Sequence, residues 1–280
     1  MRFGIKTAPQ HTSWGDMLDV WRTADEVELF ETAWNFDHFY PLQGDKNGPC
    51  LEAWVTLSAL AQATSRIRIG CMVNGVPYRH PALVANMAAS LDIVSGGRLE
   101  LGLGAGWNEQ ETKAYGIDLL PMGQRMDRFE EAVEVIDSLL VHEIMTFQGK
   151  YLQLEQARCE PKGPQQPRPP IVIGGGGEKR TLRIAARFAQ HWNLPFATPE
   201  VFHKKNEILL AHCEAVGRDS SLIMRSVQIE STADQDPAEV ADSAAALFAA
   251  GVDQVILTLR TPYRAERVAA LAKSLEAIGP

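Results

Sequence analysis

Three segments of the sequence carry residue types that can bind a ligand or move a proton. Asp37 and His38 are adjacent, and a carboxylate beside an imidazole can orient a ligand or exchange a proton near neutral pH. Residues 102–109, GLGAGWNE, place small residues at alternate positions, which lets another backbone or a ligand approach closely. The third segment, Gly174–Gly177, joins an apolar run to a helical one. We therefore expect a ligand site with a candidate proton donor.

The glycine run is the strongest of these signals. Glycine permits positive φ angles and leaves backbone N–H groups accessible, and a following helix directs its first N–H groups toward an anion. A tight turn between a strand and a helix also needs glycine, but four in a row exceed that need. The sequence therefore predicts a phosphate-binding turn, which is not a P-loop because GKS/T is missing. Its members are Gly174, Gly175, Gly176 and Gly177.

Two further segments are weaker when read alone. Gly104-Ala105-Gly106-Trp107 offers an aromatic face that could cover a ring, but it lacks the GxGxxG spacing of a dinucleotide-binding turn. Residues 70–75, GCMVNG, contain an apolar run ended by Asn-Gly. That pattern indicates either a shaped wall for a flat ligand or an ordinary buried strand followed by a turn.

These segments need a framework, and the alternation of strand-like and helical stretches predicts one. In the clearest helical stretch, 122–140, apolar residues recur at steps of three and four. Repeated β-then-α order indicates a parallel sheet, and eight such units without a linker favour a closed (β/α)8 barrel, the TIM-barrel fold, as one domain over 1–280. The expected strands are 3–6, 33–37, 67–73, 99–103, 171–174, 191–194, 224–229 and 254–259.

One stretch breaks this rhythm. Residues 143–170 end in a proline-rich run and form an excursion after the fourth strand, either a covering loop or a lid over the barrel mouth. Pro81, Pro237 and Pro262 are expected in the first turns of helices. In such a barrel, functional residues lie at the C-terminal ends of the strands, where all the segments described above fall.

Composition excludes several classes of protein. The formal net charge of −8 and the lack of a basic cluster argue against nucleic-acid binding. We expect no signal peptide, and no apolar run approaches the length that crosses a membrane. The four scattered cysteines predict no disulfide framework and fit the cytoplasm, and the histidines lack metal-ligand spacing, so we expect no metal.

Together these segments resemble the bacterial luciferase-like monooxygenase superfamily, most closely its actinobacterial branch that uses the 8-hydroxy-5-deazaflavin coenzyme F420. The resemblance runs from residue 1 to about residue 194, and 91–107, LDIVSGGRLELGLGAGW, is its most specific part. The other matching stretches are 36–42 (FDHFYPL), 66–70 (RIRIG), 78–83 (YRHPAL) and 170–177 (PIVIGGGG).

This resemblance implies a barrel with an insertion after strand four, a homodimer, and a non-prolyl cis peptide at the end of strand three. Placed on this sequence, that peptide joins Met72 to Val73 and backs the deazaflavin ring. Asp37 and His38 would border the ring, with His38 as the proton donor. The residues implied to line the ring edge are Gly104, Ala105, Gly106 and Trp107, and those implied to hold the phosphate are Gly175–Gly177.

Two positions depart from the family pattern. Members commonly have Gly-Phe-Asp in the turn before strand two, where this chain has Phe30-Glu31-Thr32. Strand six commonly opens with Ala-Asp, where this chain has Ala189-Gln190. The first departure affects only a turn. The second weakens the transfer of the family's site to this sequence at Gln190 if that Asp positions a loop or the cofactor.

We therefore predict an F420-dependent oxidoreductase that transfers a hydride between the coenzyme and a small organic substrate. Reduced FMN with oxygen, in a flavin monooxygenase, is the first alternative, because both ligands carry a ring and a phosphate. A barrel enzyme acting on a sugar phosphate without redox chemistry is the second. It would not explain an apolar Met72–Val73 wall, and we identify no catalytic lysine at a strand end. A cofactor-binding protein without turnover is also compatible with the sequence.

Overall fold

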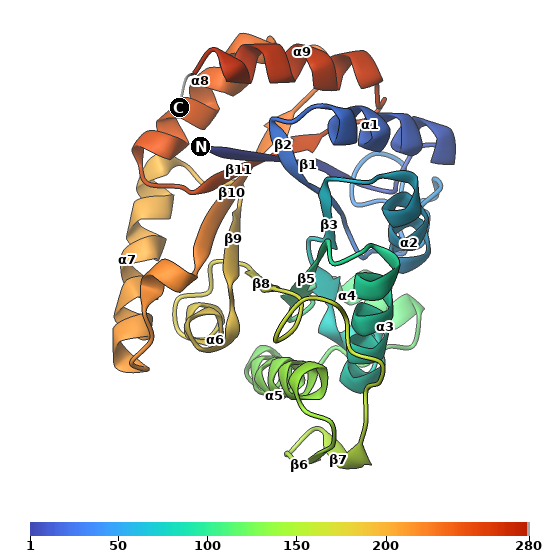
Figure 1. Cartoon of the computed structure of the whole chain (residues 1–280), viewed down its shortest axis with the longest axis vertical. Coiled ribbons are helices and arrows are strands. Elements are labelled where there is room, and N and C mark those ends of the chain that lie inside the picture. Colours follow the sequence, from blue (N-terminus) through green and yellow to red (C-terminus); the bar gives the residue numbers. More distant parts are fainter. Residues whose placement is uncertain (279–280) are drawn as a thin grey trace.

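A computed structural model describes residues 1–278, and parallel strands form a closed barrel at its centre (Figure 1). Each strand pairs in parallel with the next around the ring, and the pairing of β3 with β5 closes it. The predicted TIM-barrel fold is therefore confirmed. Its strands are β1 (Arg2–Thr7), β2 (Phe30–Asn35), β3 (Arg68–Cys71), β5 (Leu99–Gly104), β8 (Ile171–Gly174), β9 (His191–Pro195), β10 (Met224–Ser231) and β11 (Gln254–Leu259), and the two-residue β4 (Asn74–Gly75) continues the path of β3.

Helices surround the strands (Figure 1). They are α1 (Trp14–Glu26), α2 (Ala53–Ala63), α3 (Pro81–Val94), α4 (Glu109–Ala114), α5 (Met122–Val141), α6 (Thr181–Phe188), α7 (Pro199–Ala215), α8 (Pro237–Ala249) and α9 (Ala265–Glu276), with short 3-10 turns η1 (Val76–Tyr78) and η2 (Ser220–Leu222). The predicted amphipathic helix 122–140 is confirmed as α5. Pro81 and Pro237 open α3 and α8 as expected.

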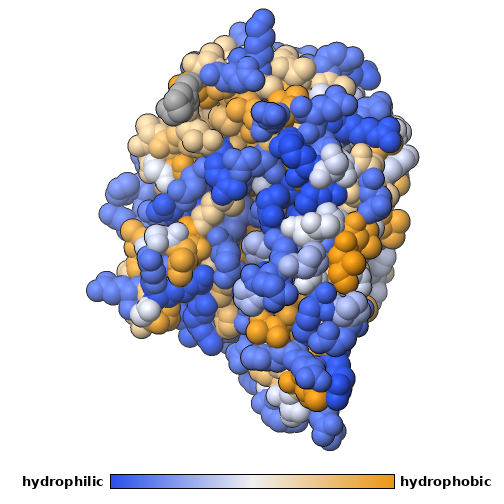
Figure 2. All heavy atoms as spheres, viewed as in Figure 1, coloured by the Kyte–Doolittle hydropathy of each residue, from blue (hydrophilic) through white to orange (hydrophobic). Residues whose placement is uncertain are grey.

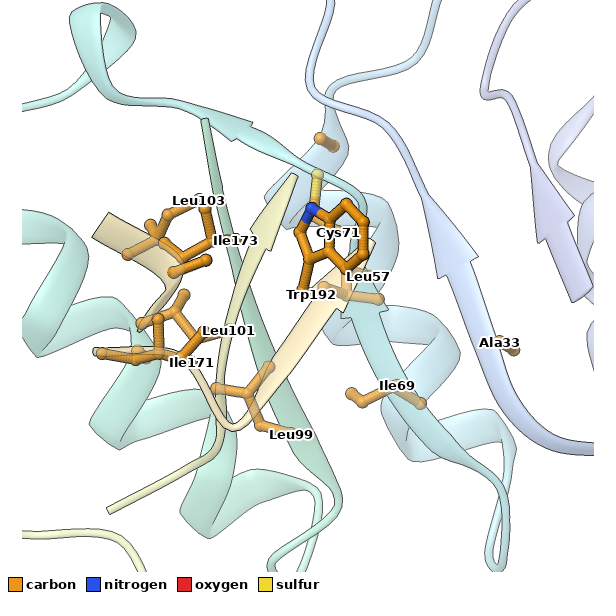
Figure 3. Packing of buried hydrophobic residues seen from close by; sticks show 14 of the residues in the cluster. Ala33, Leu57, Ile69, Cys71, Leu99, Leu101, Leu103, Ile171, Ile173 and Trp192 are labelled. Carbon is orange, nitrogen blue, oxygen red and sulfur yellow. The ribbon is translucent and has the colours of Figure 1, made fainter. Parts of the chain in front are cut away.

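The two faces of the strands differ in chemistry. On the outer face, Leu101 and Leu103 of β5 lie near Ile171 and Ile173 of β8 in a large core beneath the helices (Figure 3). Each such buried side chain contributes about 2 kcal/mol of transfer free energy. On the inner face a much smaller apolar cluster contains Trp34, Met72, Val172 and Ile256, with Val73 packed against it. The inner face is thus left for glycines and polar side chains.

Much of the barrel interior is a hydrogen-bonded polar chain. Glu100 accepts from Arg68 Nε at 2.7 Å, and its other oxygen lies 3.1 Å from His191 Nδ1. His191 Nε2 lies 2.6 Å from the Ser226 hydroxyl, which accepts from the Asn193 amide. Burial raises the pKa of Glu100, but His191 and Arg68 outweigh it and bring the pKa down to about 2. The interior therefore holds a satisfied ionic network.

Several sequence expectations about boundaries need correction. Strand two begins at Phe30 and ends at Asn35, so Phe30-Glu31-Thr32 belongs to β2 and not to the preceding turn. Asp37 and His38 therefore lie in the loop beyond the strand. The expectation that Pro262 opens a helix is wrong: it follows a cis peptide after Thr261, and α9 begins at Ala265.

The excursion at 143–170 does not cover the barrel mouth, so its interpretation as a lid is wrong. It starts with an antiparallel hairpin, β6 (Met145–Gln148) and β7 (Gln153–Ala157), whose turn donates three backbone N–H groups to Glu131 of α5. Its remainder crosses the N-terminal end of the barrel. There Gln165 donates to the carbonyl of Leu99, the first residue of β5.

Residues 1–278 lack two features that would indicate other functions. None of the described helices is both long and apolar enough to cross a membrane. Nor does this part of the chain hold a group of three or more His, Cys, Asp or Glu side chains that could bind a metal ion.

Candidate functional site

A wall built around Val73 stands at the C-terminal end of the third strand. The Met72–Val73 peptide is cis, which confirms the expectation drawn from the family resemblance. Glycines on the neighbouring strands make room for it. A Cβ added at Gly104 would lie 2.6 Å from Val73 Cγ2, and one at Gly174 would lie 2.8 Å from Val73 Cγ1. We call Met72, Val73, Gly102, Gly104 and Gly174 the Val73 wall.

The third glycine of this wall has the least freedom. A Cβ at Gly102 would lie 2.0 Å from the carbonyl oxygen of Cys71, which is backbone and cannot swing aside. Gly102, Gly104 and Gly174 are thus required by the shape of the bulge itself. The sequence predicts that Gly104 and Gly174 bind the cofactor, and in the described structure the side chain next to each of them is Val73.

The remaining glycines form the turn between β8 and α6. Gly175 has φ of +113°, a conformation that L side chains rarely adopt. Its N–H donates to the Asn193 carbonyl at 2.9 Å, and its carbonyl accepts from the Trp192 indole at 2.8 Å. Gly176 and Gly177 follow, and no side chain caps the first turn of α6. The turn therefore precedes a helix end whose first N–H groups lack a side-chain acceptor.

His38 is paired with a carboxylate, but not with Asp37. Its Nδ1 lies 2.8 Å from Glu111 Oε2, at the start of α4, and both side chains are largely buried. The same carboxylate accepts from the Tyr78 hydroxyl at 2.6 Å and from the backbone N–H of Phe39. We call His38, Phe39, Tyr78 and Glu111 the Glu111 cluster.

Opposing effects set the protonation of Glu111. Burial raises its pKa, but the hydrogen bonds from His38, Tyr78 and Phe39 outweigh burial, so the pKa lies below its usual value. Glu111 is therefore ionised at neutral pH and acts as an acceptor. The proton of a neutral His38 ring then lies on Nδ1, which donates to Glu111, and Nε2 is left for a ligand.

Asp37 has a different partner. Its Oδ2 accepts from Arg79 Nη1 at 2.7 Å and from the Gly75 N–H at 3.2 Å, while its buried Oδ1 has no protein partner in the described structure. Burial raises the pKa of Asp37, opposed by Arg79. Asp37 and His38 therefore belong to separate polar groups and do not pair with each other, and their placement at the ring stays a prediction.

Trp107 lies over the Glu111 cluster. It is 61% exposed, and its ring centroid is 5.6 Å from that of His38. The preceding Gly106 has φ of +77°, and a Cβ there would lie 2.8 Å from Pro77. Ala105 packs against the main core. A cavity of about 450 Å³ opens beside Trp107; its lining includes Tyr40, Pro41, Leu42, Glu111 and Ala114.

Sequence reasoning missed Glu111, although a local signal was present. Asn108 caps α4 by accepting from the Glu111 N–H at 3.1 Å, and Asn-x-x-Glu is close to the capping-box pattern. That pattern places Glu111 in a first helical turn just after β5, the fourth strand of the barrel, at its functional end. Nothing in the sequence indicates that His38 is its partner.

The structure also changes the interpretation of Lys6 and Gln190. Lys6, the last residue but one of β1, is a lysine near a strand end that the sequence reading overlooked. Gln190, the second departure from the family pattern, accepts from Arg168 and from the Ile171 N–H at the N-terminal end of the barrel. Gln190 therefore helps to hold the excursion and lies at the opposite end of the barrel from the Val73 wall.

Comparison with known proteins places the chain in a family. The model of that family, described as luciferase-like monooxygenase, matches residues 1–278. An F420-dependent glucose-6-phosphate dehydrogenase of Kineococcus radiotolerans is 30% identical over 247 residues, covering 87% of this chain and 71% of that protein. An F420-dependent hydroxymycolic acid dehydrogenase of Mycobacterium tuberculosis is 32% identical over 244 residues, covering 85% and 65%.

Other matches are shorter or more distant. An uncharacterised protein of Mycobacterium tuberculosis is 32% identical over 160 residues, so the match spans about half of that relative, 55% of its length and 55% of this chain. Among solved structures, an F420-dependent secondary alcohol dehydrogenase has a TM-score of 0.90 at 20% identity, covering 100% of this chain and 99% of its own. At that identity the likeness concerns the fold. On the family match over residues 1–278, this chain belongs to the luciferase-like monooxygenase family.

Proposed function

We propose that this protein is an F420-dependent oxidoreductase that transfers a hydride between the coenzyme and an organic substrate. The observation that carries the proposal is the Val73 wall, an apolar surface for which glycines on two neighbouring strands leave room at the functional end of the barrel. The F420 dependence of two relatives at 30% and 32% identity supports the choice of coenzyme.

The residues present fit a ligand with a flat ring and a phosphate. Val73 offers a branched apolar surface, packed against the inner apolar cluster, for the face of a ring. Exposed Trp107, which lies beside His38, offers an aromatic surface for the edge of such a ring. Gly175–Gly177 lead to the uncapped first turn of α6, where backbone N–H groups and the helix dipole favour an anion.

When bound, F420 supplies a ring carbon that carries hydride as a two-electron equivalent. The protein contributes the proton and the positioning. With Nδ1 held by Glu111, His38 presents Nε2 as the site that takes or gives a proton. Tyr78 and the Phe39 N–H bind the same carboxylate, which fixes the imidazole in one orientation.

The alternative is a monooxygenase that uses reduced FMN and oxygen. Solved structures of similar fold include monooxygenases, among them a long-chain alkane monooxygenase with a TM-score of 0.84 at 13% identity. The phosphate turn and the Val73 wall suit FMN as well. The two functions differ in ligand preference and in their need for oxygen.

A titration decides between them. Purified protein is titrated with oxidised F420 or with FMN while quenching of tryptophan fluorescence is followed, because Trp107 is exposed at the site. Binding of F420 at least tenfold tighter than FMN supports the proposal. Coenzyme reduction without oxygen is then measured with glucose 6-phosphate and with propan-2-ol, the substrate types named for relatives. FMN binding without an F420 response would overturn the proposal.

We also infer a homodimer that works in the cytoplasm. Val55 on α2 and Leu83 on α3 are exposed at 71% and 52%, and Figure 2 has apolar residues along the right-hand edge, where Figure 1 places these helices. The four cysteines are free thiols, as in a reducing compartment. Light scattering tests the dimer: a mass near twice 30.8 kDa supports it, and a mass near 30.8 kDa contradicts it.

A further inference from the structure

Lys6 places a cation inside the barrel at its functional end. Strand residues alternate between two faces, and Ile5 and Thr7 are fully buried on the side of the helices, so Lys6 points inward. Its ammonium confirms this direction, because it donates to Gln228 Oε1 at 2.9 Å across the neighbouring strand β11. An inward lysine in a strand is costly to bury, so its presence calls for an explanation.

Lys6 belongs to the same layer as the Val73 wall. In a (β/α)8 barrel, alternate strands contribute the inward side chains of one layer. Lys6 and Gln228 come from the first and seventh strands and touch each other. The third and fifth strands contribute the Met72–Val73 bulge and Gly174, which also touch. This layer therefore forms the bottom of the opening at the C-terminal end of the barrel. The Met72–Val73 bulge lies on one side of the layer and the Lys6 ammonium on the other.

In the described residues, the Lys6 ammonium has more N–H groups than it has acceptors. Gln228 is fixed by its other contacts, since its amide donates to Asn193 Oδ1 at 2.5 Å and its carbonyl also lies 3.3 Å from the Thr258 hydroxyl. It thus offers Lys6 one acceptor, whereas an ammonium has three N–H groups. Lys6 is only partly buried, so the remaining donors have access to the mouth. Within residues 1–278, no carboxylate pairs with it.

The electrostatic surroundings agree with this geometry. Burial lowers the pKa of Lys6 to about 8, and the charged or titratable groups that act on it are the Cys71 thiol and the Arg260 guanidinium. An ammonium with a cation nearby and no carboxylate gains free energy when an electron-rich oxygen is placed beside it.

We propose that Lys6 is a coenzyme-binding residue whose ammonium donates a hydrogen bond to an oxygen on the edge of the bound coenzyme ring. This inference rests on the proposed function. A ring with one face against Val73 directs an edge toward the other side chains of this layer, and the oxygens of a deazaflavin or flavin lie on its edges. Lys6 is the cationic side chain of that layer.

The test compares Lys6→Met with the parent protein. Methionine keeps most of the length and the apolar stem but removes the charge and the donors. The matched control is Lys273→Met, an exposed lysine in the last turn of α9. For each protein, the dissociation constant of oxidised F420, and of FMN, is measured by tryptophan quenching, and stability is measured by urea unfolding at pH 7.

We expect Lys6→Met to weaken coenzyme binding at least tenfold with no loss of stability, because the change removes a partly buried charge that has no carboxylate partner. Lys6→Arg, which keeps the cation, recovers part of the affinity. A structural role for Lys6 predicts the opposite pattern, with lower stability and unchanged dissociation constants, and would overturn the proposal. Lys273→Met leaves both quantities unchanged.

The outcomes also separate this inference from the proposed function. If the parent protein binds FMN and not F420, the proposed function fails. The effect of Lys6→Met on the dissociation constant is then still measured with FMN. If the parent binds F420 and Lys6→Met binds it equally well, the Lys6 inference fails alone. Binding of neither ligand by the parent overturns both.

Discussion

The Val73 wall and the Glu111 cluster lie at the same end of the barrel, yet different physics holds each in place. The wall depends on the absence of side chains: Gly102, Gly104 and Gly174 leave space that the bulge fills. The cluster depends on the presence of one buried carboxylate that satisfies several donors at once. Changes in the wall should therefore act on folding, and changes in the cluster on chemistry.

The largest expected effect is on the wall. Gly102→Ala places a Cβ 2.0 Å from the Cys71 carbonyl oxygen, so the bulge must shift. We expect the free energy of unfolding to fall by about 3 kcal/mol or more, measured by urea denaturation. Gly123→Ala in α5 is the control, because a Cβ there meets nothing within 4 Å. The control should be neutral or stabilising by up to about 1 kcal/mol. Equal effects of both changes would contradict the steric account.

The second largest expected effect is a loss of catalytic activity when the Glu111 cluster is changed. Glu111→Gln keeps the shape of the side chain but removes the ionised acceptor that holds His38 Nδ1. We expect kcat/KM for the identified substrate to fall about 10²-fold, the lower end of the range for general acid–base catalysis, while F420 still binds. Glu109→Gln, in the same first turn but exposed, is the matched control. A parent-like rate for Glu111→Gln would remove the cluster from the mechanism.

The same pair of proteins gives a pH prediction. The pKa of Glu111 is lower in the folded protein than in the unfolded chain, because the bonds from His38, Tyr78 and Phe39 outweigh burial. Its stabilising contribution is therefore present above the unfolded pKa of about 4.3 and is lost as pH falls through the folded value. The stability difference between the parent and Glu111→Gln should shrink from pH 7 to pH 3. A constant difference would show that Glu111 has no depressed pKa.

The smallest effect on the site is expected from the excursion. Glu131→Gln weakens the acceptor for three N–H groups in the turn of the β6–β7 hairpin. Stability should fall by about 1 kcal/mol, the usual range for such bonds, with an unchanged dissociation constant for F420. Weaker F420 binding would mean that the hairpin communicates with the mouth after all.

Features set by short stretches of chain were predictable from the sequence. β8 and β11 have the predicted bounds, and α5 begins at the predicted Met122. Glycine content marked 102–106 and 174–177 as places of close approach, but it did not indicate that Val73 is the side chain that approaches Gly104 and Gly174. The cis peptide at Met72–Val73 came from the family resemblance and not from the residues themselves.

The cluster could not be predicted in the same way. His38 and Glu111 are 73 residues apart, and their contact depends on how the loops after β2 and β5 meet. Asp37 is adjacent to His38 in the sequence, yet its carboxylate pairs with Arg79, because neighbouring side chains on an extended segment point in different directions. Lys6 was overlooked for a related reason: the direction of one lysine on a strand is settled only by barrel closure.

The decisive measurement is a structure of the protein with bound F420. We expect the deazaflavin ring to lie with one face against Val73, its phosphate at Gly175–Gly177 and His38 Nε2 facing the ring. A ring that lies outside the barrel mouth, or a phosphate bound away from the glycine turn, would contradict this expectation.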